Sequence, residues 1–167
     1  MDDSMGKTSW VSIIILCLLI LVILACAIAY LFGLPLSETR EVIIAGAGPI
    51  INGDVAVYAL TANGSTGNLL GTGVSTGYGA YFVLVNATPT DHLLVEITNG
   101  AYFDGALGVA VPLIDSDSLA AVFPADNESE AVMVTPLTHM ATTRARNLAA
   151  NGTPLEVAVQ SANIGVA

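Results

Sequence analysis

Acidic side chains at short spacing occur in two turn-like segments of the sequence. Asp115 and Asp117 flank one serine, and Asp126 and Glu128 flank Asn127. Carboxylate oxygens are ligands that calcium prefers, so these four acidic residues are weak candidates for a calcium site. Neither segment has the glycine and the distal glutamate of an EF-hand loop. We therefore expect these segments to be solvated acidic loops rather than a metal site.

Residues suited to other chemistry are scattered along the sequence. His92 and His139 belong to no paired-histidine motif, and the glycines before Pro49 lack the lysine of a phosphate-binding loop. No G-x-S-x-G sequence marks a nucleophilic serine. We expect no catalytic residue and no cofactor, and therefore no enzyme.

Four N-x-S/T sequons are candidate glycan acceptors in a host that has the machinery. All of them fall in predicted turns or at the ends of predicted elements. Turn composition alone also brings Asn, Gly, Ser and Thr together, and that is the stronger interpretation. The sequons begin at Asn63, Asn86, Asn127 and Asn151.

The charge balance excludes one class of partner. The chain has 167 residues, with 14 acidic and 4 basic side chains, and a formal net charge of -10. No cluster of Lys or Arg is present to neutralise phosphates, so nucleic acid is excluded as a partner. With 54% hydrophobic and 11% charged residues, the chain is also too apolar for a disordered protein or an ordinary soluble domain.

The excess of apolar residues is concentrated near the N-terminus. Between Val11 and Leu34 every residue is apolar except Ser12 and Gly33. A helix over this run would be about 36 Å long, and a bilayer's hydrocarbon core is about 30 Å thick. The run predicts a transmembrane helix over residues 11–34, with the lipid bilayer as partner.

The mode of membrane attachment has three interpretations. A cleaved signal peptide is disfavoured, because its apolar region is usually about 7–15 residues long. The sequence from Ile23 to Cys26 resembles a bacterial lipobox, which makes Cys26 a candidate for lipidation in a lipoprotein. An uncleaved signal-anchor is favoured, since the apolar run continues well beyond Cys26.

Basic residues near the apolar run set its orientation only weakly. Lys7 precedes the run, and Arg40 follows it between Glu38 and Glu41. We expect a short cytoplasmic N-terminus over residues 1–10 and an extracytoplasmic domain after the span. This describes a single-pass protein of the cell membrane.

The remainder of the chain is rich in short alternating segments separated by turns. Asn99-Gly100 is a strong signal for a two-residue hairpin. Many short strands with no helix between them predict an Ig- or transthyretin-like β-sandwich over 46–135, after a linker and first strand over 35–45. Strands are expected over residues 41–45, 54–60, 69–75, 80–86, 92–98, 101–104, 118–123 and 131–135.

A helical extension is expected over 136–167. Thr135-Pro136 supplies an N-cap and a first-turn proline, and Thr153 to Glu156 has the spacing of a capping box. The second helix would have few partners for its apolar side, so we expect the chain to be part of a longer one. The predicted apolar stripes comprise Leu137, Met140, Ala141, Ala145, Leu148 and Ala149, then Leu155, Ala158, Val159 and Ala162.

Two strand segments that each begin with a glycine, 48–60 and 71–82, resemble the carboxypeptidase regulatory-like (transthyretin-like) modules of bacterial membrane-anchored surface proteins. The sequence departs from their pattern at Gly77, where aspartate is common, and at Asp54, where a small residue is common. Segments 93–102 and 134–141 look like parts of surface proteins that carry such a module with a helical extension. The resemblance implies a sandwich that acts as a spacer or binding platform, and it implies no active site.

Three functions follow as hypotheses. The first is a membrane-anchored, extracytoplasmic β-sandwich with a structural, adhesive or binding role, which meets a protein or glycan ligand at the cell surface. The second is a subunit of an extracellular filament, a homo-oligomer packed through the N-terminal apolar helix. The third is a glycan-binding accessory domain, in which exposed Tyr78, Tyr81 and Tyr102 stack on sugars. Aromatic residues in strands are, however, more often core residues or cross-strand pairs.

Overall fold

The computed structural model describes residues 14–22, 24, 39–114, 117–126 and 128–164. The chain divides into two compact units, Met1–Ser37 and Glu38–Ala167. In the first unit, residues 14–22 and 24 are helical with exposed side chains, and the rest of the predicted span over 11–34 lies outside the described residues. Within the part of the chain that is described, no helix is both long enough and apolar enough to cross a membrane.

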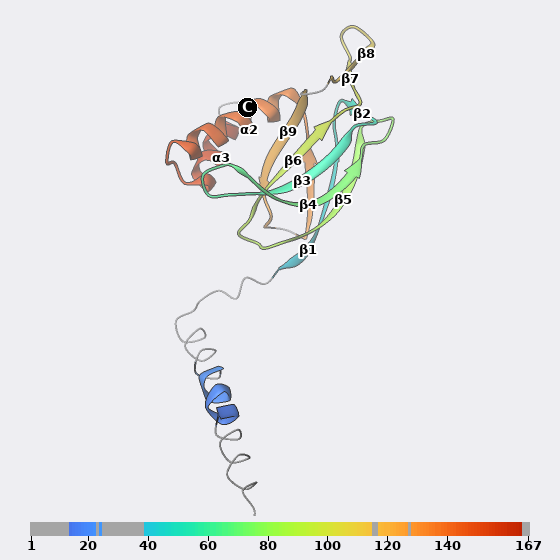
Figure 1. The fold of residues 1–167 in the computed structure, drawn as a ribbon. Helices are drawn as coiled ribbons and strands as arrows, with labels where there is room; N and C mark the ends of the chain where they lie inside the picture. Colours follow the sequence, from blue (N-terminus) through green and yellow to red (C-terminus); the bar gives the residue numbers. More distant parts are fainter. Residues whose placement is uncertain (1–13, 23, 25–38, 115–116, 127, 165–167) are drawn as a thin grey trace, which may run out of the picture. The chain divides into compact units, whose positions relative to one another are not determined.

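The second unit is mainly β-structure and ends in two short helices, as the sequence predicts at this level (Figure 1). Each predicted strand is present, and two short strands, β2 and β8, were not predicted. The elements are β1 (Arg40–Ala47), β2 (Ile50–Ile51), β3 (Asp54–Leu60), β4 (Thr66–Val74), β5 (Ala80–Ala87), β6 (His92–Thr98), β7 (Ala101–Asp104), β8 (Val109–Pro112), β9 (Ser118–Pro124), β10 (Ser129–Met133), α2 (Pro136–Ala150) and α3 (Leu155–Ile164).

The strands form three sheets. One has the order β10-β1-β5, a larger one has the order β4-β3-β6-β9, and a small one has the order β2-β7-β8. β1 is antiparallel to β5 and parallel to β10. Figure 1 shows the small sheet at one end of the domain.

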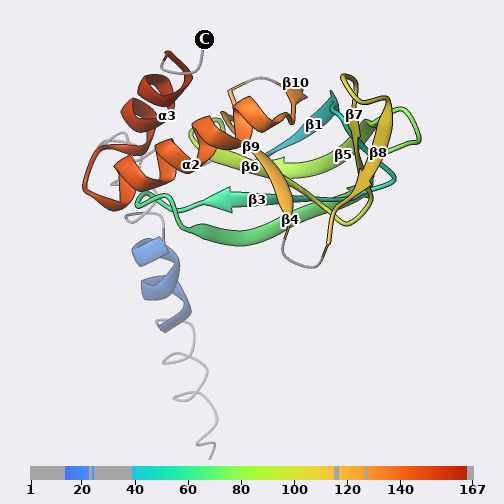
Figure 2. The same cartoon turned by 90° about the horizontal axis from the view of Figure 1, so that it is seen from above.

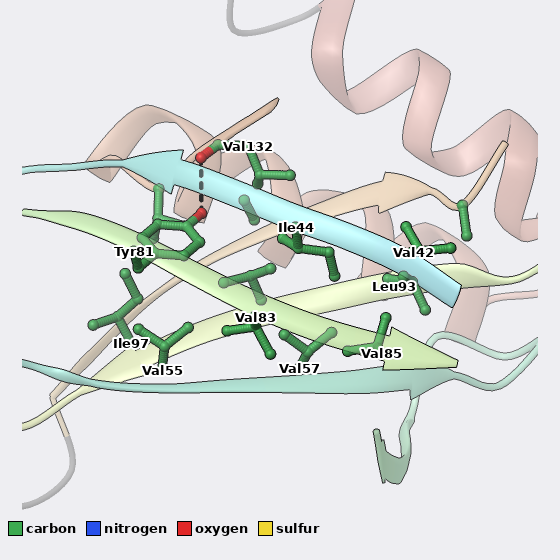
Figure 3. Packing of buried hydrophobic residues seen from close by; sticks show 14 of the residues in the cluster. Val42, Ile44, Val55, Val57, Tyr81, Val83, Val85, Leu93, Ile97 and Val132 are labelled. Atoms are coloured by element: carbon green, nitrogen blue, oxygen red, sulfur yellow. Dashed lines mark hydrogen bonds between the residues drawn. The ribbon is translucent and has the colours of Figure 1, made fainter. Parts of the chain in front are cut away.

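The hydrophobic core lies between the two larger sheets (Figure 3). Each fully buried aliphatic side chain of this kind contributes about 1.5–3 kcal/mol, so this layer dominates the stability of the domain. The core draws on β1, β3, β5, β6, β9 and β10, through residues such as Val42, Ile44, Val55, Val57, Val83, Val85, Leu93, Val95, Ile97, Ala121 and Val132.

One polar contact ties the edge strand β10 into this core. The Tyr81 hydroxyl on β5 donates a hydrogen bond of 2.7 Å to the carbonyl oxygen of Val132 on β10. Gly46 of β1 is paired with both residues, so the Tyr81 ring must cross β1 at that glycine (Figure 3). A methyl group at Gly46 would clash with the Val132 oxygen and with the Tyr81 ring. The absence of a side chain at Gly46 therefore makes the contact sterically possible.

The two helices lie against one side of the four-stranded sheet at its edge strand β9. α2 and α3 pack against β9 and against each other, as both cartoon views show (Figures 1 and 2). Their interface consists mainly of alanines, together with Leu155 and Val159, and Leu60 of β3 and Val122 of β9 pack against it. Ala121, the neighbour of Val122, points instead into the core between the sheets. β9 therefore contributes side chains to a hydrophobic cluster on each of its faces.

The predicted start of α2 is confirmed, and part of its predicted buried stripe is wrong. Thr135 is the N-cap and exchanges hydrogen bonds with Thr138 in a capping box. Leu137 and Met140 are 59% and 63% exposed. The helix turns its alanine side toward the sheet, because only small residues permit the close approach. Thr142, buried beside these alanines, reaches the Ala120 carbonyl.

The predicted hairpin at Asn99-Gly100 is also wrong. Both residues have positive φ, 54° and 82°, as a tight hairpin turn requires. However, β6 already pairs with β3 on one side and with β9 on the other, so no edge is left for β7. The chain turns here from the four-stranded sheet into the small sheet.

We expect Tyr81→Phe to lower the free energy of unfolding by about 1–3 kcal/mol, because it leaves the buried Val132 carbonyl without a donor. Gly46→Ala should lower the free energy of unfolding by more than Tyr81→Phe does, since its methyl group displaces both the Tyr81 ring and the β10 strand. Gly105→Ala is the control, because nothing lies within 4 Å of the point where its methyl group would be. Urea unfolding of the three variants tests the order. A smaller loss for Gly46→Ala than for Tyr81→Phe would contradict this packing.

Burial raises the pKa of the Tyr81 phenol well above its ordinary value of 10.0. Above about pH 10 the unfolded phenol loses its proton while the folded one keeps it, so the free energy of unfolding falls as pH rises. Between pH 8 and pH 11 this group should remove about 1.4 kcal/mol of stability. We expect the Tyr81→Phe variant to lack that part of the decline. Urea unfolding of both proteins at pH 8 and at pH 11 measures it. An equal decline of the free energy of unfolding in the wild type and in Tyr81→Phe would mean that the phenol is exposed to solvent in the folded protein.

Candidate functional site

A pocket of about 530 Å³ opens beside the small sheet. Its size is within the range of small-molecule sites, about 300–1,000 Å³. Two aromatic side chains border it: Tyr78 is 95% exposed and Phe103 is 48% exposed. The remaining lining residues are small or aliphatic: Gly48, Pro49, Ile51, Gly77 and Gly105.

Backbone hydrogen bonds fix both aromatic residues. Tyr78 is at the tip of the turn between β4 and β5, where the Thr76 hydroxyl accepts hydrogen bonds from the amides of Tyr78 (3.3 Å) and Ala80 (3.2 Å). The Phe103 amide on β7 donates to the Pro49 carbonyl at 2.8 Å. The pocket therefore lies between two backbone segments that hydrogen bonds anchor, and each segment carries one of its aromatic side chains.

The chemistry of this pocket is that of an apolar binding site. None of its lining residues, all within the described part of the chain, carries a charge. Gly77 and Gly105 leave the backbone open to close approach by a ligand, whereas the Val134 carbonyl fills the space beside Gly48. The faces of Tyr78 and Phe103 can pack against a flat or weakly polar ring. The pocket thus fits a neutral ligand better than an ionic one.

The predicted tyrosine site is only partly present. Tyr78 is exposed, as expected, and it borders the pocket. Tyr81 is only 5% exposed and belongs to the core, so its predicted exposure and sugar contact are wrong. Tyr102 is half-buried on β7 and is not a lining residue. Phe103 was missed, since a four-residue strand shows too little alternation to indicate which side faces outward.

Among the acidic candidates, Asp117 makes hydrogen bonds within a local turn. The Asp117 carboxylate accepts from the Ile114 amide at 3.4 Å, and the Asp117 amide donates to the Ile114 carbonyl at 2.9 Å. Asp126 and Glu128 are exposed in the segment before β10. Among the described residues, no group of three or more His, Cys, Asp or Glu could hold a metal ion. Asp115 lies outside those residues.

A second pocket, of about 490 Å³, lies near the start of β6 and has a more polar lining. It includes Asp91, His92, Asp126 and Glu156. The Asp91 carboxylate accepts from the Thr88 amide at 2.7 Å, which closes the turn before β6. His139 belongs to α2 and does not line this pocket. Asp91 thus has a structural role here.

Two of the four sequon asparagines make local hydrogen bonds. Asn63 accepts from the Ser65 amide at 3.1 Å in the turn before β4. The side-chain amide of Asn151 donates to the Asn147 carbonyl at 2.8 Å, where it caps α2. Asn86 is exposed within β5 and not in a turn. Asn127 and the lipidation candidate Cys26 lie outside the described residues.

Comparisons with known proteins assign no family. No protein-family model matches the chain, and no curated protein matches it in sequence. Among solved structures, a 9R-lipoxygenase from Cyanothece PCC8801 is similar to 75% of this chain with 13% identity and a TM-score of 0.34. The similar region spans 25% of the lipoxygenase chain. A likeness at this TM-score carries no argument about fold or activity.

Proposed function

We propose that the chain is a membrane-anchored, extracytoplasmic β-sandwich module that binds a ligand at the cell surface and catalyses no reaction. The apolar run over 11–34 supports the anchor, either as a transmembrane helix or through lipidation at Cys26. Two sheets that share one core support an Ig- or transthyretin-like sandwich similar to the carboxypeptidase regulatory-like modules.

The pocket bordered by Tyr78 and Phe103 carries the binding proposal. The Tyr78 ring is almost fully exposed at a turn, so it lacks the burial that usually stabilises an aromatic residue. A hydrogen bond from the Tyr78 amide to the Thr76 hydroxyl nevertheless holds the backbone of that residue in the turn. An exposed ring on a fixed backbone at the mouth of a pocket is well suited to contact a ligand.

A neutral glycan is the ligand class that this pocket fits best. The C–H face of a sugar ring is apolar and packs on an aromatic face, while its hydroxyls reach the backbone groups that the glycines expose. The net charge of -10 disfavours an anionic ligand. A glycan also agrees with placement at a cell surface.

Binding of the labelled full chain, in detergent, to an array of neutral and acidic glycans tests the proposal. We expect binding to neutral glycans and about a ten-fold loss in Tyr78→Ala, since a lost ring contact removes about 1.5 kcal/mol. Phe103→Ala should weaken binding as well. Phe82→Ala removes an exposed aromatic side chain outside the pocket and should bind as the wild type does. Failure to bind any glycan, or equal binding by Tyr78→Ala, would refute the glycan site.

A further inference from the structure

The β7–β8 hairpin is an apolar projection at one end of the domain. Its strands pair over Ala101–Asp104 and Val109–Pro112, and a turn over residues 105–108 joins them. Figure 1 shows the hairpin extending beyond the larger sheets. From Ala101 to Ile114 every residue is uncharged except Asp104. We call residues 101–112 the apolar hairpin.

Apolar side chains are exposed on both faces of this hairpin. All four residues of β8 are exposed. Phe103 lies opposite Ala110, and Tyr102 lies opposite Val111, so these two neighbouring pairs point to opposite faces. At the tip, Leu107 is 72% exposed. A flat protein partner would cover one face of the hairpin and leave the other in water, whereas lipid surrounds a projecting tip on all sides.

The backbone of the tip is hydrogen-bonded within the hairpin, as a lipid environment requires. The Asp104 carboxylate accepts hydrogen bonds from the amides of Ala106 (2.9 Å) and Leu107 (3.1 Å), and the Asp104 carbonyl accepts from the Gly108 amide at 2.8 Å. The edge strand β8 ends at Pro112, which has no N–H. A proline on an edge strand disfavours the addition of a strand from another chain. The hairpin is therefore better suited to lipid than to strand pairing.

Acidic residues at the base of the hairpin select against anionic lipid. The Asp54 carboxylate accepts a hydrogen bond of 2.6 Å from the side-chain amide of Asn99, just before β7. Asp117 is exposed just after the hairpin, before β9. With a net charge of -10 on the chain, these groups repel anionic headgroups. A zwitterionic surface, which has no net charge, avoids that repulsion.

The hairpin lies far from the point where the chain enters this unit. β1 begins at Arg40 and runs for eight residues, roughly 23 Å, before the chain reaches the small sheet. Figure 1 shows the start of β1 and the hairpin at opposite ends of the domain. A domain that is anchored through the chain before Arg40 therefore carries the hairpin at the end remote from its attachment.

We propose that the tip of the apolar hairpin inserts into the zwitterionic lipid of a facing membrane. The four-residue strands give the hairpin a length of about 13 Å, and interfacial segments enter a bilayer by about 5–10 Å. The Asp104 carboxylate keeps the insertion shallow, because an ionised group is costly in the hydrocarbon core. Leu113 packs against the domain core and holds the base of the hairpin. The choice of a facing membrane rests on the proposed anchor.

Flotation of the full chain, held in phosphatidylcholine nanodiscs, with added phosphatidylcholine vesicles tests the insertion. The discs bury the proposed anchor, so a second lipid contact is needed to bring them to the vesicles, and empty discs give the background. We expect the wild type to float with the vesicles. Leu107→Gln should bind about ten-fold more weakly, since it removes one large apolar side chain from the lipid. Val157→Gln on α3 is the matched control, because Val157 is also apolar and exposed (49%), and it should bind as the wild type does.

Tryptophan fluorescence locates the contact. Leu107→Trp is made in a chain that also carries Trp10→Phe, which removes the single native tryptophan. Its emission should shift to the blue when vesicles are added, and brominated acyl chains in those vesicles should quench it. Val157→Trp in the same background should show neither change.

The proposal is wrong if the wild type does not float, if Leu107→Gln floats equally well, or if binding requires anionic lipid. A blue shift of Leu107→Trp before vesicles are added would also overturn it, because the tip would then lie in the bilayer of the anchor. Tyr78→Ala should float as the wild type does, since these vesicles carry no glycan, so a failure of the glycan site is distinguishable. The fraction of chain that enters the discs reports separately on the anchor.

Discussion

The hydrogen bond from Tyr81 to Val132 is the interaction on which the arrangement of this domain depends. It joins the two outer strands of one sheet across the middle strand, and Gly46 leaves the space for it. β10 is a short strand paired in parallel to β1, so its backbone pairing alone is limited. The buried phenol adds a polar anchor and a large apolar contact at the same point.

This anchor also determines which surfaces remain available to partners. β10 ends at Met133, and the chain continues from there into α2. Both helices then pack against β9. The helices cover the outer side of the four-stranded sheet at β9, with Leu60 of β3 packed against them. At the end formed by the small sheet, the turns hold Tyr78 and Phe103 beside a pocket. The proposed ligand site thus lies outside the part of the domain that the helices cover.

Local patterns in the sequence predicted the elements well and their pairing less well. The limits of β3, β6 and β7 agree with the predicted segments because alternation and flanking turn residues define them. The Asn99-Gly100 turn forms, yet its strands join different sheets, since pairing depends on edges already occupied by distant strands. The sequence left both an exposed and a core position open for Tyr81 for a similar reason: an aromatic residue in a strand does not reveal which face is buried. Phe103 and the pocket arise from β2 and β7 meeting in space, which no short segment encodes.

Hydrogen exchange of the β10 amides in the full chain, in wild type and in Tyr81→Phe, is the most direct test of the central claim. If the phenol fastens this strand, the β10 amides that are hydrogen-bonded to β1 exchange slowly in the wild type, close to those of β3, and much faster in the variant. If the β10 amides exchange as fast in the wild type as those of the exposed β7–β8 hairpin, or at the same rate in both proteins, Tyr81 does not hold the strand and the account is wrong.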